Sequence, residues 1–138
     1  MVTHRIALAA DVNSARVGRG FARQHLAALD SDTTDVVVLL ISELVTNAVI
    51  HGGPHLPDAT VDLSIEVGTD GVRVEVTDAG SGTLTVGNGA PDQPSGRGLV
   101  LVEHFARQWG CEQHATGKTV WIDITQPTLL GNAPTKGR

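Results

Sequence analysis

Two neighbouring segments of alternating apolar and polar residues set the strongest limit on how this chain folds. They are Val61–Val67 and Val72–Asp78, and the four residues between them read Gly-Thr-Asp-Gly. A period of two predicts a half-buried strand, and a short glycine-containing turn between two such strands predicts an antiparallel hairpin. Because one face of this hairpin is apolar, the rest of the chain has to supply a layer that covers it.

A long apolar helix is the candidate for that layer. We expect it to run from about Thr33 to His51, after a break rich in capping residues at 30–32 and before Gly-Gly-Pro at 52–54. Residues on one arc of this helix are apolar: Val37, Ile41, Leu44, Val45, Ala48 and Val49. A first helix, capped by Asn13 or Ser14, is expected to extend to about Leu29.

The remaining pattern completes a two-layer domain. Ile6–Leu8 is a short first strand, a glycine-rich loop follows at 79–95, and a third helix runs from Leu99 to about Trp109. Cys111–Ala115 and Thr119–Thr125 form a second hairpin. The predicted fold class is α+β, a mixed and mostly antiparallel sheet covered on one face by about three helices.

Length and composition limit the kinds of function. The 138 residues fit one domain, which we place at 1–125 with a core at about 14–125 and a tail at 126–138. The chain has no apolar run of about 18 residues and no leader-like start, so we expect a cytoplasmic protein without a membrane partner. The single cysteine, Cys111, forms no internal disulfide.

Charge and aromatic content argue against nucleic acid as a direct partner. The formal net charge is −5, and the chain has two Phe, two Trp and no Tyr, without any run of Lys or Arg. Both a phosphate-binding basic patch and a set of stacking aromatic side chains are therefore missing. An anionic small ligand held by backbone amides remains compatible with this composition.

Glu43 and Asn47 are the candidate catalytic and metal-binding pair. They lie one helical turn apart, separated by about 40° around the axis, and face away from the apolar arc of the second helix. A carboxylate can act as a general base, and an amide oxygen can ligate a hard cation such as Mg²⁺. The alternative is that both are solvated positions on an amphipathic helix, and this segment alone does not decide between the two.

Three glycine motifs could place the backbone against a ligand. Residues 78–82 (DAGSG) follow a strand, residues 96–99 (GRGL) open a helix, and residues 117–119 (GKT) open the last strand. Glycine permits close backbone approach, and a helix start offers free N–H groups to phosphate. Asp78, at a strand end, can accept a hydrogen bond from an exocyclic amine such as that of adenine. Taken singly, each motif is weak, and a simple turn is the more common meaning.

The order of these motifs resembles the histidine-kinase-like (GHKL, Bergerat-fold) ATPases, and more narrowly the bacterial anti-sigma-factor serine/threonine kinases. Residues 43–52 (ELVTNAVIHG) resemble the N box of that family, and residues 95–103 (SGRGLVLVE) resemble its last glycine box. The resemblance covers roughly Ser14 to Thr125, which is nearly the whole domain.

The resemblance implies ATP and Mg²⁺ as cofactors. Asn47 would bind the Mg²⁺ that bridges the ATP phosphates, and Glu43 would be the general base that acts on a serine hydroxyl or on water. Asp78 would bind the adenine amine, and Thr119 would close the adenine side. His51 is also expected to face the nucleotide.

The other implied cofactor-binding positions lie in the glycine motifs. Gly80 and Gly82 would let the chain pass the base and ribose, and Gly96 and Gly98, with Leu99 beside them, would cradle the phosphates. Arg97 would be a catalytic charge stabiliser, and residues 83–95 would form the ATP lid.

One position departs from the family pattern. Kinases of this group are expected to carry an arginine just before the Ser-Gly-x-Gly run, and Pro94 stands there. The resemblance implies a kinase that phosphorylates an anti-anti-sigma (STAS-like) protein, with sequestration of a sigma factor and homodimerisation as further family properties. Pro94 supports the alternative of a nucleotide-dependent binding module without phosphotransfer. A third interpretation is an α+β domain whose glycines are only turns.

Overall fold

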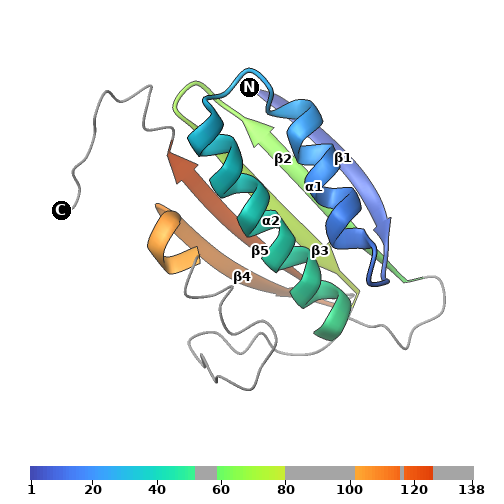
Figure 1. Cartoon of the computed structure of the whole chain (residues 1–138). Coiled ribbons are helices and arrows are strands. Elements are labelled where there is room, and N and C mark those ends of the chain that lie inside the picture. The colour runs from blue at the N-terminus through green and yellow to red at the C-terminus, as the bar shows by residue number, and fades with distance from the viewer. Residues whose placement is uncertain (52–58, 80–101, 116, 126–138) are drawn as a thin grey trace.

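The chain folds into one antiparallel sheet with two helices against it (Figure 1). The computed structural model describes residues 1–51, 59–79, 102–115 and 117–125. Sheet order is β1-β2-β3-β5-β4, and every pairing among the described strands is antiparallel. The strands are β1 (Val2–Ala9), β2 (Thr60–Val67), β3 (Gly71–Asp78), β4 (Gln108–His114) and β5 (Gly117–Thr125). The helices are α1 (Ser14–His25) and α2 (Ser31–His51).

This architecture confirms the predicted two-layer α+β fold. The sheet expected to be mixed is antiparallel throughout its described part, and β1 is longer at both ends than the predicted Ile6–Leu8. The full length of β1 pairs with β2, from Val2 opposite Val67 to Ala9 opposite Thr60. This pairing gives β1 backbone partners that its own sequence pattern does not reveal.

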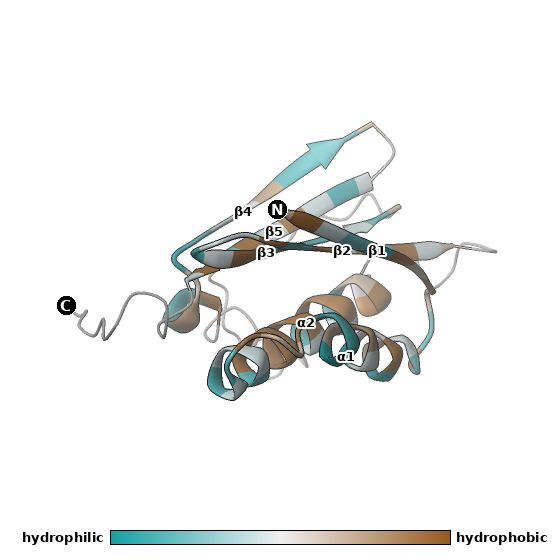
Figure 2. Ribbon diagram, turned by 90° about the horizontal axis from the view of Figure 1, so that it is seen from above, coloured by the Kyte–Doolittle hydropathy of each residue, from teal (hydrophilic) through white to brown (hydrophobic). Residues whose placement is uncertain are grey.

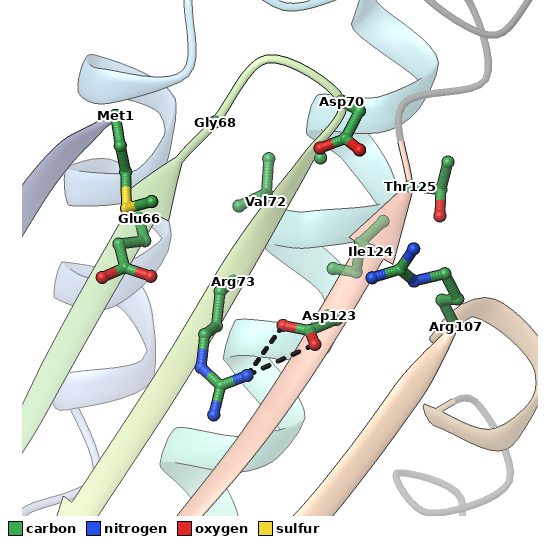
Figure 3. A pocket seen from close by; sticks show the side chains of 11 residues that line it. Met1, Glu66, Gly68, Asp70, Val72, Arg73, Arg107, Asp123, Ile124 and Thr125 are labelled. Atoms are coloured by element: carbon green, nitrogen blue, oxygen red, sulfur yellow. Dashed lines mark hydrogen bonds and ion pairs between the residues drawn. The ribbon is translucent and has the colours of Figure 1, made fainter.

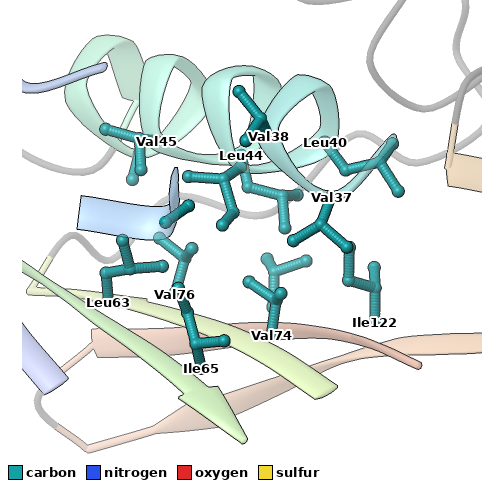
Figure 4. Close-up of a cluster of buried hydrophobic side chains, with 14 of the residues drawn as sticks. Val37, Val38, Leu40, Leu44, Val45, Leu63, Ile65, Val74, Val76 and Ile122 are labelled. Carbon is teal, nitrogen blue, oxygen red and sulfur yellow. The ribbon is translucent and has the colours of Figure 1, made fainter. Parts of the chain in front are cut away.

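The core lies between α2 and the sheet (Figure 4). Val37, Ile41 and Leu44 of α2 are buried against the strands. The inward-facing strand residues are likewise buried: Val61, Leu63, Ile65, Val72, Val74, Val76, Val120, Ile122 and Ile124. Figure 2 shows α1 and α2 against the same face of the sheet. The alternation seen in the sequence therefore assigns each strand residue to the helix-covered face or to the opposite face.

Helix α2 begins two residues earlier than predicted because Asp30 caps it. One carboxylate oxygen of Asp30 accepts the backbone N–H of Thr33 at 2.9 Å, and the other accepts the Thr33 hydroxyl at 2.6 Å. Such a contact satisfies a backbone donor that has no partner within the first turn. By length and apolar composition, Ser31–Ile50 could span a membrane, with a mean hydropathy of 1.7, but 61% of that window is buried inside the protein. This burial is typical of a core helix.

Two predicted helix ends were wrong. Helix α1 stops at His25 rather than at about Leu29, because Leu26 leaves the helix to enter the core and its carbonyl accepts the Thr34 hydroxyl at 3.1 Å. Near the third predicted helix, only residues 102–105 are described as helical, and Gln108 already belongs to β4. Trp109 pairs with Ile122 across β4 and β5 and packs against the core, which makes it a strand residue.

Candidate functional site

Glu43 and Asn47 lie in the last three turns of α2, as the sequence indicates. Asn47 is buried, with only 8% of its surface exposed, and Glu43 is half-buried. The Asn47 side chain makes no hydrogen bond within the part of the chain that the structure describes. Its low exposure does not fit a fully solvated surface position, although its amide atoms are not completely enclosed. A ligand or metal ion can provide a partner for such an amide.

A contact between the helices supports this segment of α2. The guanidinium of Arg19 in α1 donates a hydrogen bond to the Ser42 hydroxyl at 2.9 Å. Ser42 directly precedes Glu43, so the contact links α1 to the turn that carries the candidate general base. Hydrogen bonds to charged groups are stronger than neutral ones, so this contact helps to hold the two helices together.

Asp78 lies at the C-terminal end of β3, at the same end of the molecule as the C-terminal end of α2 (Figure 1). Its side chain is 3% exposed and lies on the helix-covered face with Val74 and Val76. Lys118 is its cross-strand partner on β5, and the Lys118 ammonium lies 3.0 Å from one carboxylate oxygen of Asp78. The end of the sheet next to the C-terminal end of α2 thus contains a buried charged pair.

Thr119 points away from this pair. On β5 it lies opposite Thr77, and the two hydroxyls are hydrogen bonded at 2.7 Å, while Nε2 of His114 lies 2.9 Å from the Thr119 hydroxyl. Successive residues of a strand face opposite sides of the sheet, so Thr119 and Lys118 cannot both face Asp78. This geometry does not support the expected adenine contact by Thr119. Lys118 occupies that position.

Gly117 allows β5 to begin directly against the end of β3. Its φ is +152°, in a region that side chains rarely adopt. A Cβ at this position would clash with the carbonyl oxygen of Asp78 and would lie 2.9 Å from the Cα of Ala79. The glycine of the GKT motif is therefore required by close packing of backbone on backbone at the site.

Cys111 on β4 lies on the same side of the sheet as Lys118. It pairs with Val120 and packs, half-buried, against the core. Burial raises the pKa of its thiol, the positive charge of Lys118 lowers it, and the negative charges of Asp78 and Glu112 raise it. The net shift of the pKa is upward, so the thiol is neutral at physiological pH.

The remaining expected site residues lie outside the described residues. They are Gly80, Gly82, Gly96, Arg97, Gly98 and Leu99, together with the predicted lid at 83–95 and Pro94. The backbone of His51 ends α2, but its side chain is not described. The predicted tail at 126–138 is not described either. The structure thus places the C-terminal end of α2, which carries Asn47, at the same end of the molecule as Asp78 at the end of β3. Glu43 lies one helical turn before Asn47.

Comparison with known proteins decides the family. The model of the histidine kinase-like ATPase domain matches residues 8–124. The chain belongs to this family. Two anti-sigma F factors from Clostridium botulinum strains, Eklund 17B and Alaska E43, are each 31% identical over 99 residues, covering 62% of this chain and 69% of the relative.

Solved structures agree with this assignment. The structure of the RsbU and RsbW domains of Rv1364c from Mycobacterium tuberculosis matches with a TM-score of 0.69 and 25% identity, covering 92% of this chain. This chain spans 33% of that longer protein. The catalytic domain of the histidine kinase ThkA, at 15% identity and a TM-score of 0.53, covers 91% of this chain and supports the fold alone.

Membership in the histidine kinase-like ATPase family implies ATP binding. No group of three or more His, Cys, Asp or Glu side chains among the described residues could hold a metal ion by itself. Mg²⁺ is usually held by one or two protein oxygens together with phosphates and water, rather than by a complete protein cage. The amide oxygen of Asn47, a largely covered residue without a hydrogen bond to the described chain, could supply one such oxygen.

A pocket lies at the end of the sheet away from Asp78 (Figure 3). Its lining includes the start of β3 and the end of β5, and its charged residues include Arg73, Asp123 and Arg107. The Arg73 guanidinium pairs with Asp123 at 3.1 Å and with Glu75 at 3.0 Å. Because Arg73 is already paired with two carboxylates, and no motif of the sequence falls there, we do not assign this pocket to the ATPase site.

Sequence reasoning missed Lys118, although a signal for it was present. Val120, Ile122 and Ile124 are the apolar, inward-facing residues of β5, so Lys118 has the same parity and must face inward too. Asp78 has the parity of Val74 and Val76 on β3. Strand parity therefore indicates that Lys118, rather than Thr119, lies on the face of Asp78.

Proposed function

We propose that this chain is an ATP-binding regulator of the anti-sigma-factor type that transfers the γ-phosphate of ATP to a serine or threonine of an anti-anti-sigma (STAS-like) partner. The observation that carries the proposal is Asn47, a largely covered residue whose side chain makes no hydrogen bond to the described chain. It lies one turn after Glu43 on α2, whose C-terminal end is at the same end of the molecule as that of β3. The similarity of the chain to anti-sigma F factors and to a structure of RsbU and RsbW domains supports the regulatory role.

Asn47, Asp78 and Glu43 each have a part in this proposal. Asn47 holds Mg²⁺ against the phosphates, and Asp78 accepts the adenine amine. Glu43 takes the proton from the attacking hydroxyl. Phosphoryl transfer depends mainly on positioning and on neutralising charge, which requires few covalent steps from the protein. Gly96, Gly98 and Arg97 are proposed to complete the phosphate site, as the sequence motif implies.

Thermal unfolding with and without Mg·ATP tests nucleotide binding. At a ligand concentration 100-fold above Kd, a bound ligand adds about 2.7 kcal/mol to the free energy of unfolding, which is a rise of several degrees in Tm. We expect this rise in the wild type and its loss in Asn47→Ala. Asn13→Ala is the matched control, because Asn13 is exposed and makes no side-chain cap. An equal rise in Asn47→Ala would remove Asn47 from the site.

A second function is favoured by Pro94, which replaces the arginine expected near the γ-phosphate. In this alternative the protein binds ATP or ADP and holds a partner without phosphorylating it. Incubation with radiolabelled ATP and the STAS-domain proteins of the same organism separates the two. Stoichiometric phosphoserine on one of them supports the kinase, whereas nucleotide-dependent complex formation without label supports the binding module.

A further inference from the structure

Lys118 is a buried cation at the predicted base-binding end of the site. Its side chain is 4% exposed and that of Asp78 is 3% exposed, and the two lie opposite each other on β5 and β3. Lysine is almost never fully buried unless its charge is paired. The ion pair with Asp78, at 3.0 Å, provides that pairing.

The pairing leaves the ammonium incompletely satisfied. Nζ of Lys118 has no hydrogen-bond partner within the described chain, so its contact with Asp78 is an ion pair without a hydrogen bond. An ammonium carries three N–H donors and no acceptor. Buried donors, and charged ones above all, are costly to leave without an acceptor. A ligand that presents an acceptor next to Asp78 would remove that cost.

We propose that Lys118 is a base-reading residue, which donates a hydrogen bond to a ring nitrogen of adenine while Asp78 accepts one from the 6-amino group. This inference rests on the proposed nucleotide site and adds a specificity determinant to it. The carboxylate and the ammonium present an acceptor and a donor side by side. Adenine presents the complementary arrangement, because N1 and N7 are acceptors on either side of the amine.

A purely structural role is the competing explanation. Lys118 would then only neutralise Asp78, and the base would contact the carboxylate alone. The two roles differ in their response to adenine analogues. Replacing N1 or N7 by carbon removes an acceptor but keeps the amine, so only a base-reading Lys118 makes binding sensitive to one of these changes.

Isothermal titration with Mg·ATP and with the 1-deaza and 7-deaza analogues of ATP tests this in the wild-type protein. We expect one of the two analogues to bind about ten- to a hundredfold more weakly than ATP, which is the loss of one hydrogen bond to a charged donor. Equal affinity for all three nucleotides would overturn the proposal. So would tighter binding of GTP than of ATP, since guanine carries a carbonyl at position 6.

The Lys118→Met variant tests whether the Lys118 side chain causes the weaker binding of the analogue. It should bind ATP about tenfold or more weakly and bind the sensitive analogue as well as it binds ATP. Discrimination that persists in Lys118→Met, or that disappears in Thr119→Val instead, contradicts the proposal. If Lys118→Met does not fold, the affinities of the wild-type protein for ATP and its two analogues still test the proposal. A wild-type protein that binds none of the nucleotides would count against the proposed function itself.

Discussion

Gly117 on β5 and the carbonyl oxygen of Asp78 on β3 are packed so closely that no side chain fits between them. Gly117 also has a φ of +152°. The strand end that presents Asp78 and the strand start that presents Lys118 are therefore held together by backbone contact. The first prediction follows from this contact.

Gly117→Ala should lower the free energy of unfolding by about 2–4 kcal/mol, because it adds a backbone clash to an unfavourable φ. Gly20→Ala is the matched control, since Gly20 is inside α1 and a Cβ there meets nothing within 4 Å. That change should be neutral or stabilising by up to about 1 kcal/mol. Urea unfolding of both variants measures the difference, and equal stabilities would contradict the packing described here.

The core between α2 and the sheet provides a second prediction. Ile65 is fully buried, so Ile65→Ala should cost about 2–5 kcal/mol of unfolding free energy through lost burial and a residual cavity. Ile50 is 39% exposed, and the same change there should cost less than about 1 kcal/mol. Denaturant unfolding of the two variants makes the comparison. A larger loss at Ile50 would mean that the helix is rotated from its position in Figure 4.

Glu43 is predicted to act in phosphoryl transfer rather than in binding. Glu43→Gln keeps the size of the side chain and removes the base, so phosphorylation of a STAS-like partner should slow by about 10²–10⁴-fold. The Kd for Mg·ATP should change little. Asp35→Asn, at an exposed acid on the same helix, controls for the change in charge. A Glu43→Gln variant with full phosphotransfer would assign the base elsewhere.

The pKa of the Cys111 thiol depends on the charges of Lys118 and Asp78. Because its pKa is raised by burial, alkylation by iodoacetamide should reach its half-maximal rate at a pH above about 8.5, the value for a free thiol. The ammonium of Lys118 lowers this pKa, so Lys118→Met should raise it and slow the reaction further. Rates measured from pH 7 to 10, with the urea-unfolded protein as reference, test both statements. A midpoint below that of the unfolded protein would show that Cys111 is not buried as described.

Most of the fold follows from local sequence patterns. The hairpin of β2 and β3 was predicted within one residue because alternation and a glycine turn lie next to each other in the chain. The end of α1 was predicted less well, because Leu26 leaves the helix for a tertiary reason, the space it fills in the core and its contact with Thr34. Because Leu26 also fits the helical spacing of apolar residues, the sequence pattern does not show that the helix ends before it.

In the site, too, local sequence motifs predict some features, and others depend on contacts between distant segments. Asn47 and Asp78 were found from motifs within single segments, and the structure brings their elements to one end of the sheet. The choice of Thr119 was made within one motif, whereas the side chain opposite Asp78 depends on the pairing of two strands about 40 residues apart in the chain. The roles of the glycines at 80, 82, 96 and 98 stay predictions, because those residues lie outside the described ranges.

The pairing of β3 with β5 links the stability of the core to the chemistry of the pocket. The register that puts Val120, Ile122 and Ile124 under α2 also puts Lys118 opposite Asp78. Sliding β5 by one residue would present Thr119 to Asp78, but it would also turn the three apolar side chains away from the core. From β5, a different group would therefore face Asp78 through replacement of residue 118 rather than through a shift of the strand. If Lys118 contacts the base as proposed, ligand preference could change through a single amino acid while the sheet stays as it is.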